Sequence, residues 1–138
     1  MSRIVNSQST GRERAQLVRA IVVAIRELSR QSSFGEEARD LASFIVLALQ
    51  TVLKGVDASA KAWEKRGYWV KADRFRMDWD WAEPLAAQLR SAIESADEPL
   101  VASLVMRIAQ RLSGVQVSSN PRVGKPWIGA FARLRSDS

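Results

Sequence analysis

The sequence predicts an all-α fold, an antiparallel four-helix bundle with an additional C-terminal loop and short helix. Apolar residues recur every three or four positions from Leu17 to Leu112, which is the period of helices with one buried face. Of the 138 residues, 46% are hydrophobic, enough to build the core of one domain of ordinary size. There is no β-hairpin signal and no internal repeat. Four antiparallel helices joined by short loops are the simplest assembly.

The first helix is expected to begin near Thr10, after a flexible arm of residues 1–9. Thr10 and Glu13 have the spacing of a capping box, in which each side chain accepts a hydrogen bond from an unpaired backbone N–H. The apolar residues that follow, up to Leu28, lie at helical spacing and predict one buried face.

The second helix is expected over residues 35–54, as the most buried of the set, because apolar side chains cover most of its circumference. Ser33 and Glu36 repeat the capping-box spacing at its start. Gly55 is expected to end or weaken this helix, and Gly67 marks a second weak point further along.

Residues 68–96 predict one long helix that contains Pro84. Since proline cannot donate a backbone hydrogen bond, the helix either kinks near residues 80–84 or restarts with Pro84 in a new first turn. Asp97 is a good N-cap for the next helix, and Gly114 is expected at the C′ position that ends it.

The last part of the chain, residues 115–138, is predicted to be a basic tail that packs on the bundle of residues 10–114. Serine, asparagine, proline and glycine residues make 115–125 a loop, and a short helix is possible from Pro126. The whole chain is therefore interpreted as a single domain.

The composition narrows the classes of function. Without cysteine the chain forms no disulfide or thiolate metal site, and without histidine it lacks the commonest general base. No signal-peptide pattern is seen, and the longest uninterrupted apolar runs are too short to cross a bilayer. We therefore expect a cytoplasmic, non-catalytic protein with no cofactor, no metal site and no membrane partner.

The net charge of +6 is distributed in blocks. Residues 1–30 and 61–76 each carry a net +4, residues 77–106 carry −5, and residues 107–138 carry +5. Basic patches favour nucleic acid or acidic proteins as partners. The alternative is a solvated surface that serves solubility alone.

Residues 62–81 combine aromatic and basic side chains, including four of the five tryptophans. Rings that stack on bases and cations that neutralise phosphates are typical of nucleic-acid surfaces. Helical spacing instead predicts that Trp69, Phe75 and Trp79 belong to the core, whereas the pattern does not decide for Trp63, Tyr68 and Trp81. A ridge of arginines along the first helix adds a second basic region. The predicted contacts for sequence-independent nucleic-acid binding are Arg12, Arg19, Arg26, Lys65, Arg66, Lys71, Arg74 and Arg76.

A protein–protein scaffold or homo-oligomer is the alternative function. Trp, Tyr and Arg dominate interface energetics. The tail can place Trp127 and Phe131 in a groove of this bundle or of another chain. The candidate interface residues are Trp63, Tyr68, Trp81, Trp127 and Phe131.

A metal-dependent phosphohydrolase is a third, minor interpretation. Glu37-x-x-Asp40 and Glu94-x-x-Asp97 each place two carboxylates one helical turn apart. This resembles the paired motifs of all-helical nucleotide pyrophosphohydrolases, in which such carboxylates hold magnesium. The separation between the two pairs is longer than in that family, and both pairs lie at predicted helix ends.

Overall fold

The structure, a computed structural model, describes residues 7–137, and within this range it contains helices and no strand. The prediction of an all-α fold is confirmed. The helices are α1 (Ser7–Ser29), α2 (Glu36–Lys65), α3 (Trp69–Asp78), α4 (Ala82–Glu94), α5 (Glu98–Arg111) and α6 (Ala130–Ser136).

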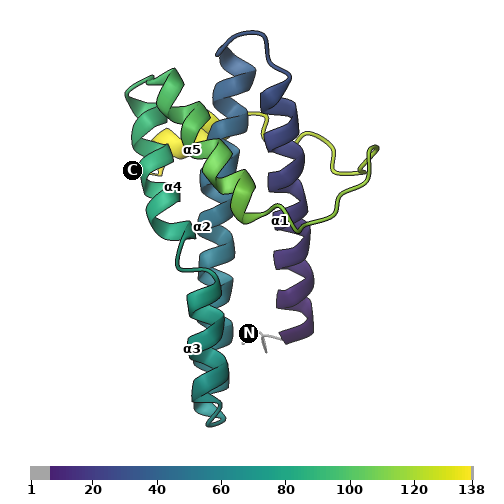
Figure 1. The fold of residues 1–138 in the computed structure, drawn as a ribbon, viewed down its shortest axis with the longest axis vertical. Coiled ribbons are helices and arrows are strands. Elements are labelled where there is room, and N and C mark those ends of the chain that lie inside the picture. The colour runs from purple at the N-terminus through teal and green to yellow at the C-terminus, as the bar shows by residue number, and fades with distance from the viewer. Residues whose placement is uncertain (1–6, 138) are drawn as a thin grey trace.

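The long helix α2 is the centre of the molecule, because α1, α3, α4 and α6 all pack against it. Helix α5 packs on α4 and crosses toward α1 (Figure 1). These helices, without α3, form what we call the helical body. The last turns of α2 extend beyond it and pair with α3, so that an α2–α3 hairpin projects from one end (Figure 1).

Helix α2 runs without interruption through Gly55, so the predicted end near residue 54 is wrong. A glycine inside a helix costs only about 1 kcal/mol relative to alanine. The apolar face continues through this position, with Val52 before Gly55 and Val56 and Ala60 after it all buried. Burial of this face therefore outweighs the low helix propensity of one glycine.

Helix α2 is also long and apolar enough, by length and composition, to cross a membrane. The best 18-residue window has a mean hydropathy of 1.5, and 56% of that window is buried in the fold. The uninterrupted apolar runs of the sequence do not reveal this hydropathy, because a few polar residues divide the window. The buried part of α2 packs at the centre of the helical body, against α1, α4 and α6.

Helix ends differ from the prediction at three places. Helix α1 already includes Ser7, so residues 7–9 are helical and Thr10 lies inside the helix; residues 1–6 lie outside the described residues. Gly35 is the N-cap of α2, and no side chain caps this end. Gly114 lies beyond the C′ position, because α5 ends at Arg111 with Leu112 as its C-cap.

The expected single helix over 68–96 is two helices, separated by a turn at residues 79–81. Of the two alternatives for Pro84, the restart is confirmed, since Pro84 lies in the first turn of α4. Asp97 is confirmed as the N-cap of α5, and its Oδ1 accepts a hydrogen bond of 3.1 Å from the backbone N–H of Leu100. Both features follow from local backbone chemistry that the sequence displays.

The C-terminal segment returns to the core. Trp127, Ala130 and Leu134 are at most 2% exposed and belong to the main hydrophobic cluster. The Asp40 carboxylate of α2 accepts hydrogen bonds from the backbone N–H groups of Gly129 at 3.1 Å and Phe131 at 2.9 Å. Helix α6 therefore begins at Ala130 rather than at Pro126.

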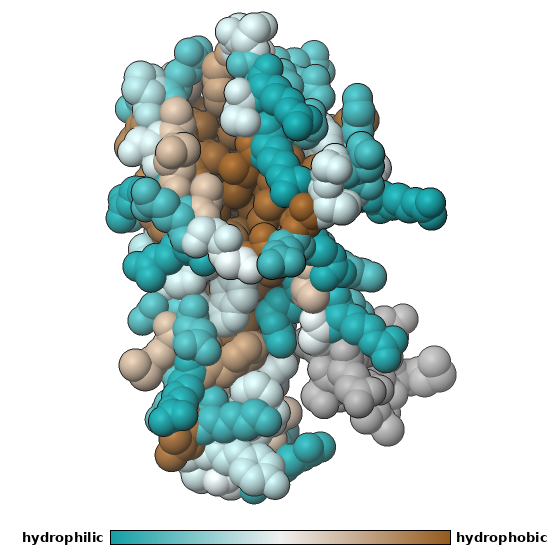
Figure 2. Space-filling model, turned by 45° about the vertical axis from the view of Figure 1, so that its right-hand side comes forward, coloured by the Kyte–Doolittle hydropathy of each residue, from teal (hydrophilic) through white to brown (hydrophobic). Residues whose placement is uncertain are grey.

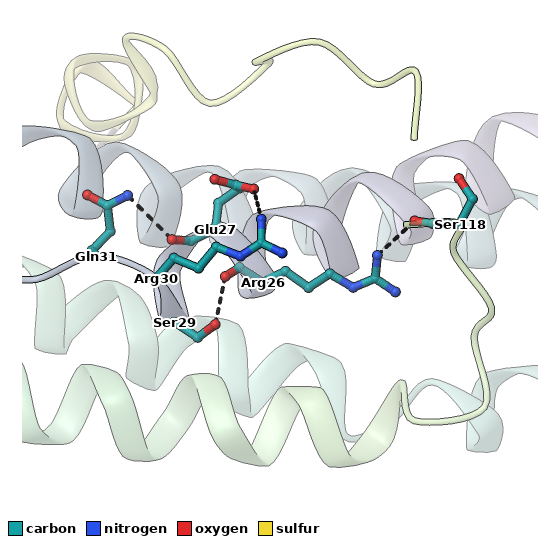
Figure 3. A network of polar contacts seen from close by, with 6 residues as sticks. All are labelled: Arg26, Glu27, Ser29, Arg30, Gln31 and Ser118. Atoms are coloured by element: carbon teal, nitrogen blue, oxygen red, sulfur yellow. Dashed lines mark hydrogen bonds and ion pairs between the residues drawn. The ribbon is translucent and has the colours of Figure 1, made fainter. Parts of the chain in front are cut away.

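The loop between α5 and α6 passes around α1. In Figure 1 it leaves α5 in front of α1, swings outward and returns behind α1 toward α6. Arg26 of α1 donates hydrogen bonds of 2.9 Å to the carbonyl oxygens of Val117 and Ser118 in this loop. Figure 3 shows the Arg26 side chain extended toward Ser118. Arg30, which follows Arg26 on the same ridge, pairs with Glu27 at 2.9 Å, so two arginines of the predicted basic ridge have structural partners.

Candidate functional site

The α2–α3 hairpin is shaped by a tight turn at Gly67. The N–H of Gly67 donates to the carbonyl of Glu64, and the N–H of Tyr68 donates to the carbonyl of Trp63, both at 2.9 Å. These two bonds, with Gly67 at a φ of +82°, form a Schellman motif. Glycine adopts this left-handed conformation without strain. Gly67 is therefore the stop signal of α2, and it fixes the direction in which α3 returns.

A cluster around Phe75 holds α3 in place. The ring of Phe75 lies 5.0 Å from that of Trp63 on α2, and the guanidinium of Arg14 on α1 lies 4.7 Å above Phe75. The ammonium of Lys71 lies 4.5 Å from the Trp63 ring centroid. Cations over aromatic faces attract the ring electrons and stabilise such contacts. We call Arg14, Trp63, Lys71 and Phe75 the Phe75 cluster.

An ion-pair network lies beside this cluster. Arg76 donates to both carboxylate oxygens of Glu64, at 2.7 and 3.0 Å, and lies 3.8 Å from Asp57, which also pairs with Lys61 at 3.0 Å. The hydrogen bonds from Arg76 lower the pKa of Glu64, and those bonds to Glu64 raise the pKa of Arg76. The Arg76 guanidinium is therefore already paired with carboxylates of this chain.

The far end of the hairpin, residues 65–74, is what we call the hairpin tip. The side chains of Lys65, Arg66 and Arg74 are exposed there and make no hydrogen bond or ion pair with any residue that the structure describes. Asp73 is the one acidic residue in this segment, against four cationic residues. In Figure 2 the lower end of the molecule carries hydrophilic side chains around a small apolar patch.

The predicted basic ridge of α1 is not part of this tip. Arg12 and Arg14 are two residues apart, so they point to opposite sides of the helix, and only Arg14 reaches α3. Arg12 and Arg19 are exposed, and Arg19 lines a hollow of about 690 Å³ between α1 and residues 116–126. Arg26 binds the loop, as described above. The structure therefore brings together the cations of residues 65–74 but not those of α1.

Arg14 is the residue of this region that sequence reasoning missed. Its spacing from Val18 and Ile21, four and seven residues, places it on the apolar face of α1. Its Nη1 is buried and has no hydrogen-bond partner among the described residues, and burial lowers its pKa. A cation at a core position of the apolar pattern was the signal that could have found it.

The burial of the aromatic residues in 62–81 differs in part from the prediction. Phe75 and Trp79 are partly buried against the core, but Trp69 is 61% exposed, so its predicted place in the core is wrong. Trp69 is the first residue of α3, at the far end of the hairpin, beyond the reach of the helical body (Figure 1). Helical spacing alone does not show where a neighbouring helix ends.

The candidate interface residues also have different environments. Tyr68 is 55% exposed, whereas Trp63 is partly buried in the Phe75 cluster. Trp81 stacks on Trp79 at 5.7 Å, and its Nε1 donates to the carbonyl of Asp78. In the tail, Trp127 is buried in this chain's own core. Of the two grooves considered for Trp127, it therefore fills the one within the same chain. Phe131 is partly buried, with Arg39 and Arg135 over its ring.

Each of the two carboxylate pairs is engaged in contacts within the described part of the chain. Among the described residues no group of three or more acidic side chains lies close enough to hold an ion. Asp40 binds backbone N–H groups before α6, Asp97 caps α5, and Glu94 pairs with Arg90 at 3.3 Å.

Comparison of the chain with protein-family models, with curated proteins and with solved structures gives no match. A function is therefore inferred from the geometry of the hairpin.

Proposed function

We propose that this chain is a binding module that contacts the backbone of nucleic acid through its hairpin tip. In this proposal an antiparallel four-helix bundle of α1, α2, α4 and α5 supports the α2–α3 hairpin. The observation that carries the proposal is the exposure of Lys65, Arg66 and Arg74 without any described acidic partner.

The neighbouring acids support this proposal. Glu64 and Asp57 are occupied by Arg76 and Lys61, so they do not neutralise the tip. A polyanion that approaches the tip exchanges its condensed counterions for fixed cations, which favours binding. Since phosphates are the same along any sequence, such contacts make binding independent of sequence.

Substitution of the three tip cations by glutamine (Lys65→Gln, Arg66→Gln, Arg74→Gln) tests the proposal. Fluorescence anisotropy with a labelled oligonucleotide, at salt concentrations from about 50 to 200 mM, measures the affinity and its salt slope. We expect the affinity to fall on the order of tenfold or more. The slope of log K against log salt should become shallower by about 2–3, since each lost phosphate contact removes about 0.9.

A matched control removes the same charge elsewhere, with Arg12→Gln, Arg19→Gln and Arg107→Gln, all exposed residues outside the hairpin. We expect this variant to retain at least most of the affinity. An equal loss in both variants would show that net charge acts without a site, and binding that does not change with salt would reject the electrostatic contact.

Self-association through α3 is a second candidate, favoured by one observation. Val70 and Met77 are 70% and 68% exposed, and seven residues separate them, so they lie on the same outer face of α3. Large exposed apolar side chains in one place mark interaction surfaces. We expect sedimentation to give a mass near twice 15.4 kDa, and Met77→Glu to return it to the monomer value. A monomer at high protein concentration would exclude this candidate.

A further inference from the structure

We infer that the hairpin tip selects single-stranded over double-stranded nucleic acid, by stacking exposed bases on Tyr68 and Trp69. This inference rests on the proposed function and adds the class of nucleic acid. Tyr68 and Trp69 are neighbours at the end of the hairpin and are 55% and 61% exposed.

The other rings of this region already have partners. Trp63 packs on Phe75 and lies under Lys71, and Trp79 stacks on Trp81. By contrast, Tyr68 and Trp69 have no ring contact or cation over their faces among the contacts of the described residues. Their faces are therefore available to a ligand.

Cations lie on both sides of these rings along the chain. Lys65 and Arg66 precede them, and Lys71 and Arg74 follow. The Schellman turn at Gly67 holds the preceding pair and the rings in a defined arrangement. Aromatic rings between cations are the combination that binds single strands, since bases stack on the rings while the backbone follows the positive charge.

A duplex lacks the accessible base faces that such rings need. Its bases are stacked on each other inside the helix, and a protein that stacks on them acts on single-stranded, looped or extruded nucleotides. The cations of the tip contact phosphates in either form, so they give duplex binding without the contribution of the rings.

A lipid surface is the other ligand that exposed Tyr and Trp residues suit. The tip is poorly built for it, because Asp73 lies one helical turn from Trp69 and is exposed on the same helix. Insertion of Trp69 and Val70 into a bilayer would bring this carboxylate toward the hydrocarbon, at a high cost. Stacking on a base leaves Asp73 in water.

The test compares a labelled strand of about 20 deoxythymidines with a duplex of equal length, longer than a typical single-strand site. We expect the wild-type chain to bind the single strand at least tenfold more tightly. Trp69→Ala should lower the single-strand affinity by about 5- to 140-fold, the range for loss of one stacked base, and should leave duplex affinity unchanged. Met106→Ala, at an exposed apolar residue of α5 outside the hairpin, is the control and should change neither affinity.

Four other outcomes overturn the inference in different ways. Equal binding of both forms, unaffected by Trp69→Ala, removes the stacking role and leaves the proposed function intact. Equal loss of both affinities in Trp69→Ala also removes the selectivity. Binding of neither form removes the proposed function itself. Trp69-dependent binding to phosphatidylserine vesicles, without nucleic-acid binding, assigns the tip to a membrane. Since Trp69 is exposed, circular dichroism of Trp69→Ala should match that of the wild type.

Discussion

Trp127→Ala is expected to lower the free energy of unfolding by about 3–5 kcal/mol, the range for removing a large aromatic side chain from a core. The Trp127 side chain is 2% exposed and belongs to the main hydrophobic cluster. It is also the largest side chain that attaches the segment after α5 to the helical body. Urea unfolding followed by circular dichroism at helix wavelengths measures the loss without depending on tryptophan fluorescence.

Two control variants test how much of the loss in stability comes from the buried Trp127 ring. The Nε1 of Trp127 is buried and has no hydrogen-bond partner among the described residues, so Trp127→Phe removes an unpaired donor along with part of the ring. We expect Trp127→Phe to lose less than half as much stability as Trp127→Ala. Ile128→Ala, at a residue that is 65% exposed, should change stability by less than about 0.5 kcal/mol. A Trp127→Ala protein as stable as the Ile128→Ala protein would show that the tail does not contribute to the core.

Periodicity predicted the parts of the fold in which one helix buries one face. The apolar pattern correctly indicated an all-helical fold. Local backbone chemistry identified Asp97 as an N-cap and gave a helix restart at Pro84 as one of two alternatives. Both local features depend on a few adjacent residues. This is why they could be found without knowing the tertiary contacts.

The predictions of helix ends and of burial were wrong where tertiary packing outweighs a local signal, or where one residue type is compatible with two local structures. The low helix propensity of Gly55 predicts either the end of the helix or a weak point, but the buried residues on either side keep α2 continuous. Gly67 reads as a weak point and is instead the residue that ends α2. Trp69 has the spacing of a core residue, but it is exposed at the end of the hairpin, beyond the helical body.

The sequence predicted only the part of the candidate site that does not depend on tertiary contacts. Solvent exposure of Lys65, Arg66 and Arg74 follows from their chemistry, since charged side chains avoid burial unless paired. The commitment of Arg76 to Glu64 and of Arg26 to the C-terminal loop depends on segments that meet only in three dimensions. Spacing along α1 identifies a basic ridge but does not show which side of the helix faces α3.

Phe75→Ala is expected to release α3 from the rest of the molecule. Phe75 contacts Trp63 of α2 and lies under Arg14 of α1, and Ala72 is the one residue of α3 that is fully buried. A ten-residue helix is marginal in water without such packing. We expect a loss of about 2 kcal/mol, less than for a fully buried ring because Phe75 is partly buried.

The loss should be local, and hydrogen exchange can show this. Amides of α3 should exchange faster in Phe75→Ala, while those of α2 within the helical body should keep their protection, because opening of a weakly packed segment does not require global unfolding. Met77→Ala, on the exposed outer face of the same helix, is the control and should leave exchange unchanged. Uniformly faster exchange in α2 and α3 would instead show that the hairpin and the helical body unfold as one unit. With a local loss, Phe75→Ala should also weaken nucleic-acid binding, since the tip cations and rings would no longer be held in one arrangement.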